Sequence, residues 1–581
     1  MNAYVAREGS EAPVGEPLAP GADYEVVCNV GAPDPRGLLT PETGSAFPGE
    51  MLPTDAPELQ AVLYVRGAPA GRPVPLRVPA RGDSPWVRLP LPRRPAGTAV
   101  YAELTLYYGV VAVHVTAITV PVGGPPGRGG PTAKALYALA RSFTGLGRLA
   151  SRRVSVLVSG EPTSPALQVN GMSFAPNSIS IEAKAVDDAV FAARRHLYRM
   201  QFDDGPVSRY SGSYGKSNDA LVADLRVLAN LGVRLYDNLF PRPDVYATMA
   251  ELVRMEAGSH ARPPILQVVG LGERPAPIPW AVLYDLPLGD VPSRYQPCRS
   301  IAEYGTGAPR PSAPARCPYE ADHRDGDRWR PDQLCPWGFW GLSSVIEHPP
   351  YVEGRDLELV VQDGDGGLPV SVLAVDSADG LDPRLTRRHF DALTTRLGGA
   401  FTRPTITTLD GLCAELAGET MDVIYMYSHC GYDMAADGVG YDLYLRMYGD
   451  ILTPADVNQW TRTSGWPDPH WPRRHPLVIL NGCHTTETVT GTFSSFVRSF
   501  ANRAQASGVL GTEITMEQGL AGWAMELFLT DFVHGATVGE ALRDTRWKMF
   551  AHGNLMGLAY TPHCLADLTL RRASRMESPW Y

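Results

Sequence analysis

Two short apolar runs in the C-terminal half of the chain each end in a side chain that can take part in catalysis. Residues 421–429 read Met-Asp-Val-Ile-Tyr-Met-Tyr-Ser-His and end at His429, and residues 476–483 read Pro-Leu-Val-Ile-Leu-Asn-Gly-Cys and end at Cys483. A thiol is a good nucleophile only as its thiolate, and a nearby imidazole can accept the proton. Cys483 and His429 are therefore a candidate nucleophile and general base.

The elements that must position these two side chains are strands. Runs of four to eight β-branched and aromatic residues, bounded by Gly, Pro or polar residues, are typical of buried strands of a parallel sheet. In an open α/β sheet the functional site lies beyond the carboxyl ends of such strands, so His429 and Cys483 are expected to meet there. Taken alone, a Cys and a His at two strand ends are more often structural than catalytic, and this alternative stays open on the pattern alone.

The residues before Cys483 distinguish it from the neighbouring cysteines. Asn and Gly precede it, and these residues tolerate a sharp turn after a strand. Such a turn could aim both the thiol and a backbone N–H group at an oxyanion. In contrast, Cys430 is adjacent to His429, and Cys413 lies on a predicted helix.

Composition excludes several functional classes. The length of 581 residues predicts two or three domains. The net charge of -10 is spread along the chain without a run of Lys or Arg, which argues against direct nucleic-acid binding. The N-terminus lacks the pattern of a signal peptide, and nowhere do about 18 apolar residues run together, so we expect a cytoplasmic protein without a membrane partner. The eight irregularly spaced cysteines do not form a disulfide framework.

The N-terminal part of the chain has a different pattern from the rest. Between 24 and 122 several short strands follow one another without helices, which predicts a β-sandwich over residues 1–121 that binds a partner or covers the site. The Gly- and Pro-rich residues 122–131 are typical of a linker. Residues 132–149 are predicted as a helix, and strands then alternate with helices, so residues 132–581 are predicted to form an α/β domain.

An irregular, Pro-rich insertion at about 289–350 interrupts the α/β pattern. It carries three thiols and one imidazole, from Cys298, Cys317, Cys335 and His323. Three Cys and one His are an accepted tetrahedral zinc set, although the usual close Cys pair is missing. A structural zinc would help so irregular a segment to stay folded. The alternative is that these are ordinary loop or core residues.

Four sequence features follow one another in a recognisable order. Residues 278–285 read Ile-Pro-Trp-Ala-Val-Leu-Tyr-Asp, residues 423–431 end in His-Cys-Gly, residues 477–486 contain Leu-Asn-Gly-Cys-His-Thr, and residues 508–512 and 538–543 read Gly-Val-Leu-Gly-Thr and Val-Gly-Glu-Ala-Leu-Arg. In this combination the chain resembles the CHAT family of clan CD cysteine peptidases, which are related to caspases. The resemblance implies an α/β caspase-like domain with a mostly parallel central sheet, preceded here by the N-terminal β-sandwich.

By this resemblance Cys483 is the nucleophile and His429 the general base. The implied oxyanion donors are the N–H of Cys483 and an N–H just after His429. The family usually has Gly directly after the His, whereas this chain has Cys430 and then Gly431, so either residue could supply the second donor.

Two further positions concern the surroundings of the pair. His484 stands beside the nucleophile where family members often carry Glu. Related peptidases select the residue before the cleaved bond through a pocket near the dyad, and an acidic group there could pair with a basic side chain. The acidic candidates for this pocket, each with a solvated loop charge as the alternative, are Asp433, Asp437, Glu513 and Glu517.

Two functions are consistent with these observations. The first is a cysteine endopeptidase that acts on a protein substrate, needs no cofactor for catalysis and is activated by a protein partner through its N-terminal domain. For this reading the resemblance implies a bacterial defence or cell-death system, in which an infection signal releases cleavage of a protein such as a pore former. The second function is a catalytically silent adaptor that keeps the caspase-like fold to scaffold a complex.

Overall fold

The chain divides into two compact units. Unit 1 comprises Met1–Ser180, Leu266–Pro275 and Pro350–Leu357, and unit 2 comprises Ile181–Ile265, Ala276–Pro349 and Glu358–Tyr581. The computed structural model describes residues 1–39, 58–79, 82–124, 129–161, 164–172, 174–202, 208–210, 213–254, 262–272, 278–305, 313–326, 328–352, 355–362, 371–376, 380–417, 421–434, 441–463, 471, 475–486 and 495–571.

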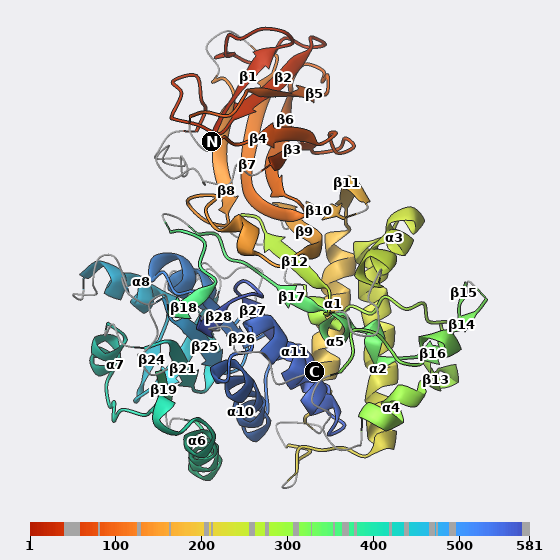
Figure 1. Cartoon of the computed structure of the whole chain (residues 1–581), viewed down its shortest axis with the longest axis vertical. Helices are drawn as coiled ribbons and strands as arrows, with labels where there is room; N and C mark the ends of the chain where they lie inside the picture. Colours follow the sequence, from red (N-terminus) through yellow and green to blue (C-terminus); the bar gives the residue numbers. More distant parts are fainter. Residues whose placement is uncertain are drawn as a thin grey trace. The chain divides into compact units, whose positions relative to one another are not determined.

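Unit 1 is built mainly from antiparallel strands, which are coloured red to orange in Figure 1 except for the yellow-green β12. One sheet has the order β1–β2–β5, a second has the order β4–β3–β6–β7–β8, and in a third β11, β10, β9 and β12 are successive neighbours. The strands are β1 (Asn2–Arg7), β2 (Tyr24–Asn29), β3 (Glu58–Val65), β4 (Val74–Arg77), β5 (Val87–Leu91), β6 (Thr98–Tyr108), β7 (Val111–Val122), β8 (Thr132–Ala138), β9 (Arg152–Glu161), β10 (Ser164–Gly171), β11 (Phe174–Ser180) and β12 (Ile265–Gly270). The strands predicted between 24 and 122 are therefore present, while their arrangement as a sandwich stays a prediction.

The structure differs from the sequence-based prediction just after the predicted linker at residues 122–131. β7 and β8 flank this segment and pair antiparallel, from Thr119 opposite Thr132 to His114 opposite Ala138. Residues 132–138 thus form a strand where a helix was predicted over 132–149, and they belong to the same compact unit as the residues before the predicted linker. The Ala-rich sequence after Thr132 has good helix propensity, but a long partner strand on β7 outweighs that weak local preference.

Unit 2 contains a mostly parallel sheet with the order β20–β19–β21–β25–β26–β27. Each neighbouring pair is parallel except β26 with β27. The predicted α/β class and mostly parallel central sheet are therefore confirmed. The strands are β19 (Val372–Asp376), β20 (Phe401–Thr402), β21 (Val423–Tyr427), β25 (Leu477–Asn481), β26 (Gly508–Thr512) and β27 (Tyr560–His563).

Helices pack on both faces of this sheet. Alternate side chains of each strand point to opposite faces, and both faces are buried by helices. Ile424 and Met426 of β21 join an apolar cluster with Leu412 of one helix and Phe496 of another. On the other face, Tyr425 of β21 contacts His389 of a third helix, and Asn481 of β25 contacts Ala521 of a fourth. The first face is covered by α7 (Leu409–Leu416), α8 (Pro454–Thr463) and α9 (Phe496–Arg498), and the second by α6 (Pro383–Leu397) and α10 (Gln518–Val533).

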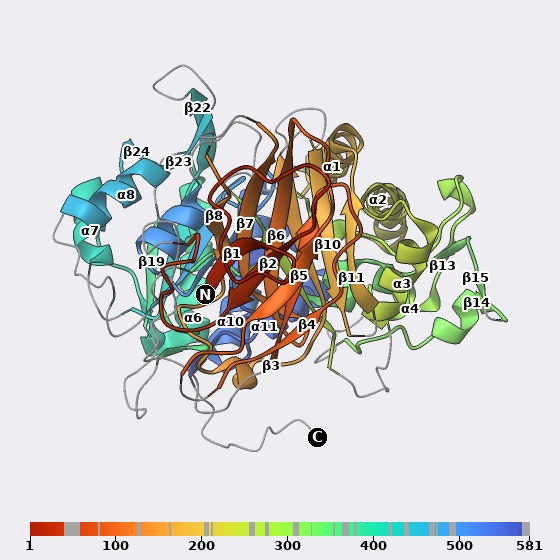
Figure 2. The same cartoon turned by 90° about the horizontal axis from the view of Figure 1, so that it is seen from above.

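The remaining elements of unit 2 surround this core. A smaller sheet, β22–β23–β24, leads into α8, and Figure 2 shows these strands grouped near that helix. The long helices outside the sheet are α1 (Ala183–Arg199), α2 (Asn218–Leu239), α3 (Pro243–Arg254) and α11 (Val538–Phe550). The short strands are β22 (Cys430–Met434), β23 (Tyr441–Met447), β24 (Asp450–Leu452), β18 (Val360–Gln362) and β28 (Thr569–Arg571). Within the described residues, none of the helices combines the length and apolar character that crossing a bilayer requires.

The predicted insertion is poor in regular structure. Its longest element is α4 (Arg299–Tyr304), and its strands are two or three residues long. These elements are β13 (Gln296–Pro297), β14 (Arg324–Asp325), β15 (Arg328–Trp329), β16 (Gln333–Leu334), α5 (Trp340–Ser343) and β17 (Val345–Glu347).

Candidate active site

His429 and Cys483 follow two neighbouring strands of the central sheet. β21 pairs in parallel with β25, and the last paired residues are Tyr427 and Asn481. His429 and Cys483 each lie two residues beyond this pair. Since parallel strands end at the same edge of a sheet, the fold brings the two side chains to one edge, where ligands bind in α/β proteins.

The two turns beyond these strands touch at Gly482. A Cβ atom on this residue would lie 2.8 Å from the carbonyl oxygen of Ser428 and 3.2 Å from Cβ of Cys430. Both distances are shorter than an optimal contact between non-bonded heavy atoms, which is about 3.5 Å or more. Glycine therefore lets the residue before Cys483 lie directly against the residues on either side of His429.

The turn after Cys483 is held in an uncommon backbone conformation. His484 has a φ of 58°, in the left-handed region that residues with a Cβ seldom occupy. Its backbone N–H donates to the carbonyl of Ile514 at 3.2 Å, and its ring Nε2 lies 2.8 Å from Oγ1 of Thr515. These contacts attach the turn to the segment after β26. Backbone strain of this kind is often found at functional sites, where surrounding contacts maintain it.

His429 is half-buried among groups that favour its neutral form. Burial lowers the pKa of its imidazole, and the positive charge of Arg446 lowers it further. Gly380, which follows β19, packs against the side chain of His429. A Cβ built on Gly380 would lie 3.5 Å from both Cβ and Cγ of His429. The imidazole is therefore neutral near pH 7 and able to accept a proton.

Cys483 differs from the other cysteines in its exposure. Of the eight cysteines, seven are buried and Cys483 alone is partly exposed. Its thiol lies 3.8 Å from the carbonyl oxygen of Met516. Burial raises the pKa of the thiol, so the sulfur is protonated at rest and needs a base to become a nucleophile.

The strand pairing after His429 distinguishes the two predicted oxyanion donors. The N–H of Arg446 donates to the carbonyl of His429 at 2.8 Å, and the register continues with Cys430 opposite Leu445 and Gly431 opposite Tyr444. Hydrogen-bonded and non-hydrogen-bonded pairs alternate along antiparallel strands, so Gly431 falls on a hydrogen-bonded pair and Cys430 does not. The N–H of Gly431 is thereby directed at β23.

Of the four acidic residues predicted for a specificity pocket, two have side chains that the structure describes. The side chain of Asp433 and the whole of Asp437 lie outside the described residues. Glu517 is the N-cap of α10, where its carboxylate accepts from the N–H of Leu520 at 2.7 Å. The buried carboxylate of Glu513 accepts from the hydroxyl of Thr561, and a second contact joins it to Nη2 of Arg194 at 3.4 Å. Both described carboxylates thus make contacts within unit 2.

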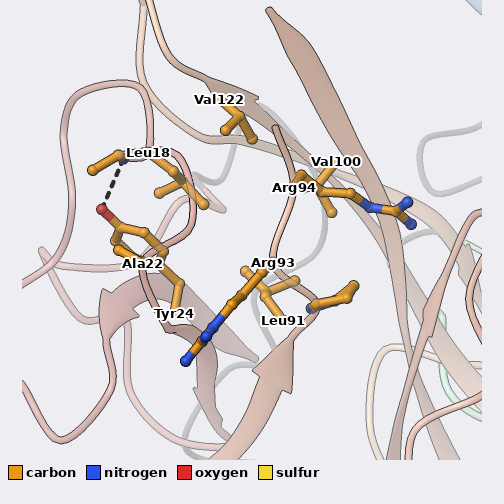
Figure 3. A pocket seen from close by; sticks show the side chains of 10 residues that line it. Leu18, Ala22, Tyr24, Leu91, Arg93, Arg94, Val100 and Val122 are labelled. Atoms are coloured by element: carbon orange, nitrogen blue, oxygen red, sulfur yellow. Dashed lines mark hydrogen bonds between the residues drawn. The ribbon is translucent and has the colours of Figure 1, made fainter. Parts of the chain in front are cut away.

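A small pocket in unit 1 is lined by Leu18, Tyr24, Arg93 and Val122, among other residues (Figure 3). Its volume of about 10 Å³ is roughly that needed by one water molecule. The hydroxyl of Tyr24 accepts from the N–H of Ala19 at 2.9 Å. The pocket is too small for a peptide side chain, so it does not compete with the strand ends of unit 2 as a candidate substrate site.

The four predicted metal ligands converge in the insertion. Their ligand atoms all lie within 4.8 Å of one another, and all four residues are buried. The Sγ atoms of Cys298 and Cys317 are 3.6 Å apart, and Nε2 of His323 lies 3.1 Å and 3.7 Å from them. Ligand atoms of a tetrahedral zinc site are separated by about 3.5–3.8 Å, given Zn–S and Zn–N bonds of about 2.3 and 2.0 Å. The cluster is therefore able to bind a metal ion.

The local fold explains how ligands without a close sequence pair come together. β13 and β16 pair in parallel, with Pro297 opposite Leu334. Cys298 and Cys335 are the next residues on each strand, so they lie side by side, and the N–H of Cys298 donates to the carbonyl of Leu334 at 2.8 Å. The hydroxyl of Ser300 is a second neighbour of the Cys298 sulfur, at 3.0 Å.

Sequence reasoning did not identify the buried polar residues behind the strand ends. Asn481 and His389 are both buried in unit 2. An amide within an otherwise apolar buried strand is a signal that could have marked Asn481, because such a group must find hydrogen-bond partners. His389 lies on a helix far from both runs in sequence, and no local pattern marks it.

The chain is similar to one curated protein with a described activity class. No protein-family model matches it. A probable protease of Vitiosangium sp. (strain GDMCC 1.1324) is 26% identical over 469 residues, which cover 75% of this chain and 56% of the relative. The chain thus spans little more than half the length of that relative.

Among solved structures, the chain is similar to two crystal structures of the Saccharomyces cerevisiae separase–securin complex. The first has a TM-score of 0.36 at 8% identity and covers 72% of this chain and 30% of the other. The second has a TM-score of 0.35 at 9% identity and covers 71% and 30%. These TM-scores are too low to support an inference about this chain.

Proposed function

We propose that the protein is a caspase-like cysteine endopeptidase of the CHAT type, with Cys483 as nucleophile and His429 as general base. The observation that carries the proposal is the placement of both side chains two residues beyond the last paired residues of β21 and β25. The similarity to a probable protease and the ordered sequence segments around both residues support the same reading. The proposal also gives the partial exposure of Cys483 a chemical reason.

In the proposed reaction, His429 takes the thiol proton as Sγ of Cys483 attacks the carbonyl carbon of the scissile peptide bond. The tetrahedral intermediate collapses when the C–N bond breaks, and His429 passes the proton to the leaving amine. Water, deprotonated by His429, then hydrolyses the thioester. The first step requires a protonated thiol beside a neutral imidazole, and the raised pKa of Cys483 and the lowered pKa of His429 favour that resting state.

The proposed oxyanion donors are the backbone N–H groups of Cys483 and Cys430. The register of β22 on β23 directs the N–H of Gly431 into the strand pairing, which favours Cys430 as the second donor. Preorganised N–H groups aimed at the developing negative charge are often the largest contribution to acyl transfer.

We also propose that a protein partner activates the enzyme, with the N-terminal strands of unit 1 as the docking surface. The resemblance to CHAT peptidases supports this proposal and suggests a bacterial defence or cell-death system. A protonated resting thiol fits an enzyme that is inactive until another protein adjusts the site.

One observation favours a second candidate, the catalytically silent adaptor. Burial raises the pKa of Cys483, whereas activated cysteines usually have a lowered thiol pKa. If the thiol never ionises, the caspase-like unit would serve only as a binding platform.

The two candidates are separated by mapping new protein N-termini in bacterial cells that express the chain together with its activating partner. The parent is expected to generate new termini, and Cys483→Ala and His429→Ala are each expected to remove them. Cys413→Ala, which removes a buried cysteine of the apolar cluster, is the matched control and should behave as the parent. New termini that persist in the Cys483 and His429 variants would contradict the dyad, and their absence in all four proteins would favour the adaptor.

We further propose that the cluster of Cys298, Cys317, His323 and Cys335 holds a structural zinc ion. The donor set and the convergence of its four buried ligand atoms support zinc, which favours thiolate and imidazole ligands and a closed four-ligand shell. The ion would stabilise the insertion and takes no part in the proposed peptide hydrolysis.

A further inference from the structure

A chain of buried polar side chains lies behind the strand ends that carry His429 and Cys483. The ring of His389 bridges two neighbours: its Nδ1 is 3.0 Å from Oε1 of Glu526, and its Nε2 is 2.8 Å from the hydroxyl of Tyr425. The same hydroxyl accepts from Nδ2 of Asn481 at 2.8 Å. The hydroxyl of Tyr560 donates to Oδ1 of Asn481 at 3.0 Å.

The orientation of the Asn481 amide is fixed by its surroundings. Nδ2 also donates to the backbone carbonyl of Ala521 at 3.0 Å. If the amide were reversed, its oxygen would face that carbonyl oxygen, and two acceptors would meet without a proton. Asn481 therefore donates to Tyr425 and accepts from Tyr560.

With the amide fixed, a single order of donors satisfies the whole chain. Tyr425 accepts from Asn481 and donates its own proton to Nε2 of His389, and Nδ1–H of His389 donates to Glu526. Each member thereby uses its polar atoms in one direction. Buried networks in which all members are satisfied are rigid and specify one arrangement.

These side chains connect five elements around the proposed catalytic edge. Tyr425 and Asn481 belong to β21 and β25, His389 to α6, Glu526 to α10 and Tyr560 to β27. All are buried or nearly so, with Tyr425 and Tyr560 fully inaccessible. Asn481 is two residues before Cys483 and is the last residue of β25 that pairs with β21. The network therefore fixes the strand ends from which both turns start.

We propose that Asn481, Tyr425 and His389 are positioning residues that hold the turn of Cys483 in register with the turn of His429. The inference rests on the proposed function of that pair. Small errors in the placement of reacting groups are costly, since a misplacement of about 1 Å can lower a rate by about 100-fold. A purely apolar strand pair could be as well packed but would lack these directional hydrogen bonds at the strand ends.

The first test is Tyr425→Phe, which removes the central hydroxyl and keeps the ring. Tyr236→Phe is the matched control, because it also removes a fully buried hydroxyl in unit 2, one that donates to the carbonyl of Tyr246 at 2.9 Å. Alkylation of Cys483 by iodoacetamide is followed by mass spectrometry from pH 5 to 9, together with thermal unfolding of each protein.

In the parent, alkylation of Cys483 below pH 8 is expected to follow the titration of His429, because the imidazole assists ionisation of the thiol. Tyr425→Phe is expected to lower the rate in this range by about 10-fold or more and leave only the profile of an isolated thiol. Tyr236→Phe should keep the parent profile even if both variants lose similar thermal stability. An unchanged profile in Tyr425→Phe would overturn the positioning role.

A pair of His389 variants separates positioning from simple packing. His389→Gln offers an amide that can accept from Tyr425 and donate to Glu526, whereas His389→Leu fills the space without polar atoms. We expect His389→Gln to restore most of the parent alkylation rate and His389→Leu to resemble Tyr425→Phe. Equal rates in the two His389 variants would contradict the proposal. If Cys483 of the parent shows no contribution from His429 at any pH, the proposed dyad fails, and the positioning role fails with it.

Discussion

Unit 2 contains two sets of cysteine and histidine side chains. We propose that one set catalyses peptide hydrolysis and that the other binds a metal ion. At the strand ends, one partly exposed thiol, that of Cys483, shares a sheet edge with His429. In the insertion, three thiols and one imidazole are all buried, with their ligand atoms within 4.8 Å of one another. The first arrangement places a partly exposed cysteine near a single candidate base, whereas the second brings four buried ligand atoms together as a metal ion would require.

In both sets, two of the side chains stand just beyond a pair of parallel strands. Cys298 and Cys335 come directly after the paired residues of β13 and β16, and His429 and Cys483 come two residues after those of β21 and β25. The difference is in what converges on each thiol. Additional buried ligands favour metal binding, and a single base with open space favours nucleophilic attack. Residue type alone therefore does not decide the chemistry.

The largest effect is expected when one of the candidate metal ligands is removed. Cys335→Ser replaces a thiolate with a poor zinc ligand, and we expect the zinc content of the purified protein to fall from about one ion per chain to almost none. Since structural zinc supplies about 10 kcal/mol or more to folding in small zinc peptides, we also expect a large fall in the unfolding temperature. Elemental analysis and calorimetry measure both changes.

The control is Cys564→Ser, the same substitution at another buried cysteine of unit 2. It should keep the zinc and cost far less stability. Zinc content near zero in the parent, after purification without chelators, would contradict the metal site.

Adding a side chain where the turns of His429 and Cys483 touch should lower the reactivity of Cys483. Gly482→Ala places a Cβ 2.8 Å from the carbonyl oxygen of Ser428, so the turns must move apart. We expect a loss of about 1–3 kcal/mol in the free energy of unfolding, typical of overpacking, and a marked fall in Cys483 reactivity. The control is Gly399→Ala, where an added Cβ meets nothing within 4 Å. Parent-like reactivity in Gly482→Ala would mean that the turns need not touch.

The charge of Arg446 offers a smaller and purely electrostatic test. Arg446 lowers the pKa of His429, so Arg446→Gln should raise that pKa and leave less of the imidazole neutral at acidic pH. The acid limb of Cys483 reactivity should therefore move to higher pH, with the plateau unchanged. Arg462→Gln on α8 removes the same charge elsewhere and should leave the limb in place. A shift to lower pH would contradict the base role of His429.

The smallest effect is expected at Glu517. Its carboxylate caps α10, and Glu517→Gln keeps an acceptor for the N–H of Leu520. We expect a change of about 0.5 kcal/mol or less in stability, and no change in the residues preferred before the cleaved bond. Loss of cleavage after basic residues, measured by N-terminal mapping, would instead assign this carboxylate to the specificity pocket.

The strands that carry the proposed catalytic pair could be predicted because their sequences are locally consistent. Residues 423–427 and 477–481 are continuous apolar runs between turn residues, and such runs have few alternatives to a buried parallel strand. The position of His429 and Cys483 at one edge follows from that topology. In contrast, β8 was predicted as a helix, because the partner strand that determines its structure is not visible in its own composition.

The contacts that refine the site could not be predicted, because they depend on residues distant in sequence. His389 meets Tyr425 through the packing of α6 on the sheet, and no periodicity reveals which side chain it will face. The candidate metal ligands Cys298 and Cys335 are neighbours because β13 pairs with β16. Spacing rules that require two cysteines close in sequence therefore give little support to this metal site.

The most direct test of the catalytic account is labelling with a peptidyl acyloxymethyl ketone, which reacts with a thiol activated by a neighbouring base. Tryptic mapping is done on the parent and on His429→Ala under identical conditions. We predict an adduct on Cys483 alone among the eight cysteines, and its loss in His429→Ala. An adduct on Cys430, or equal labelling of Cys483 with and without His429, would contradict the dyad.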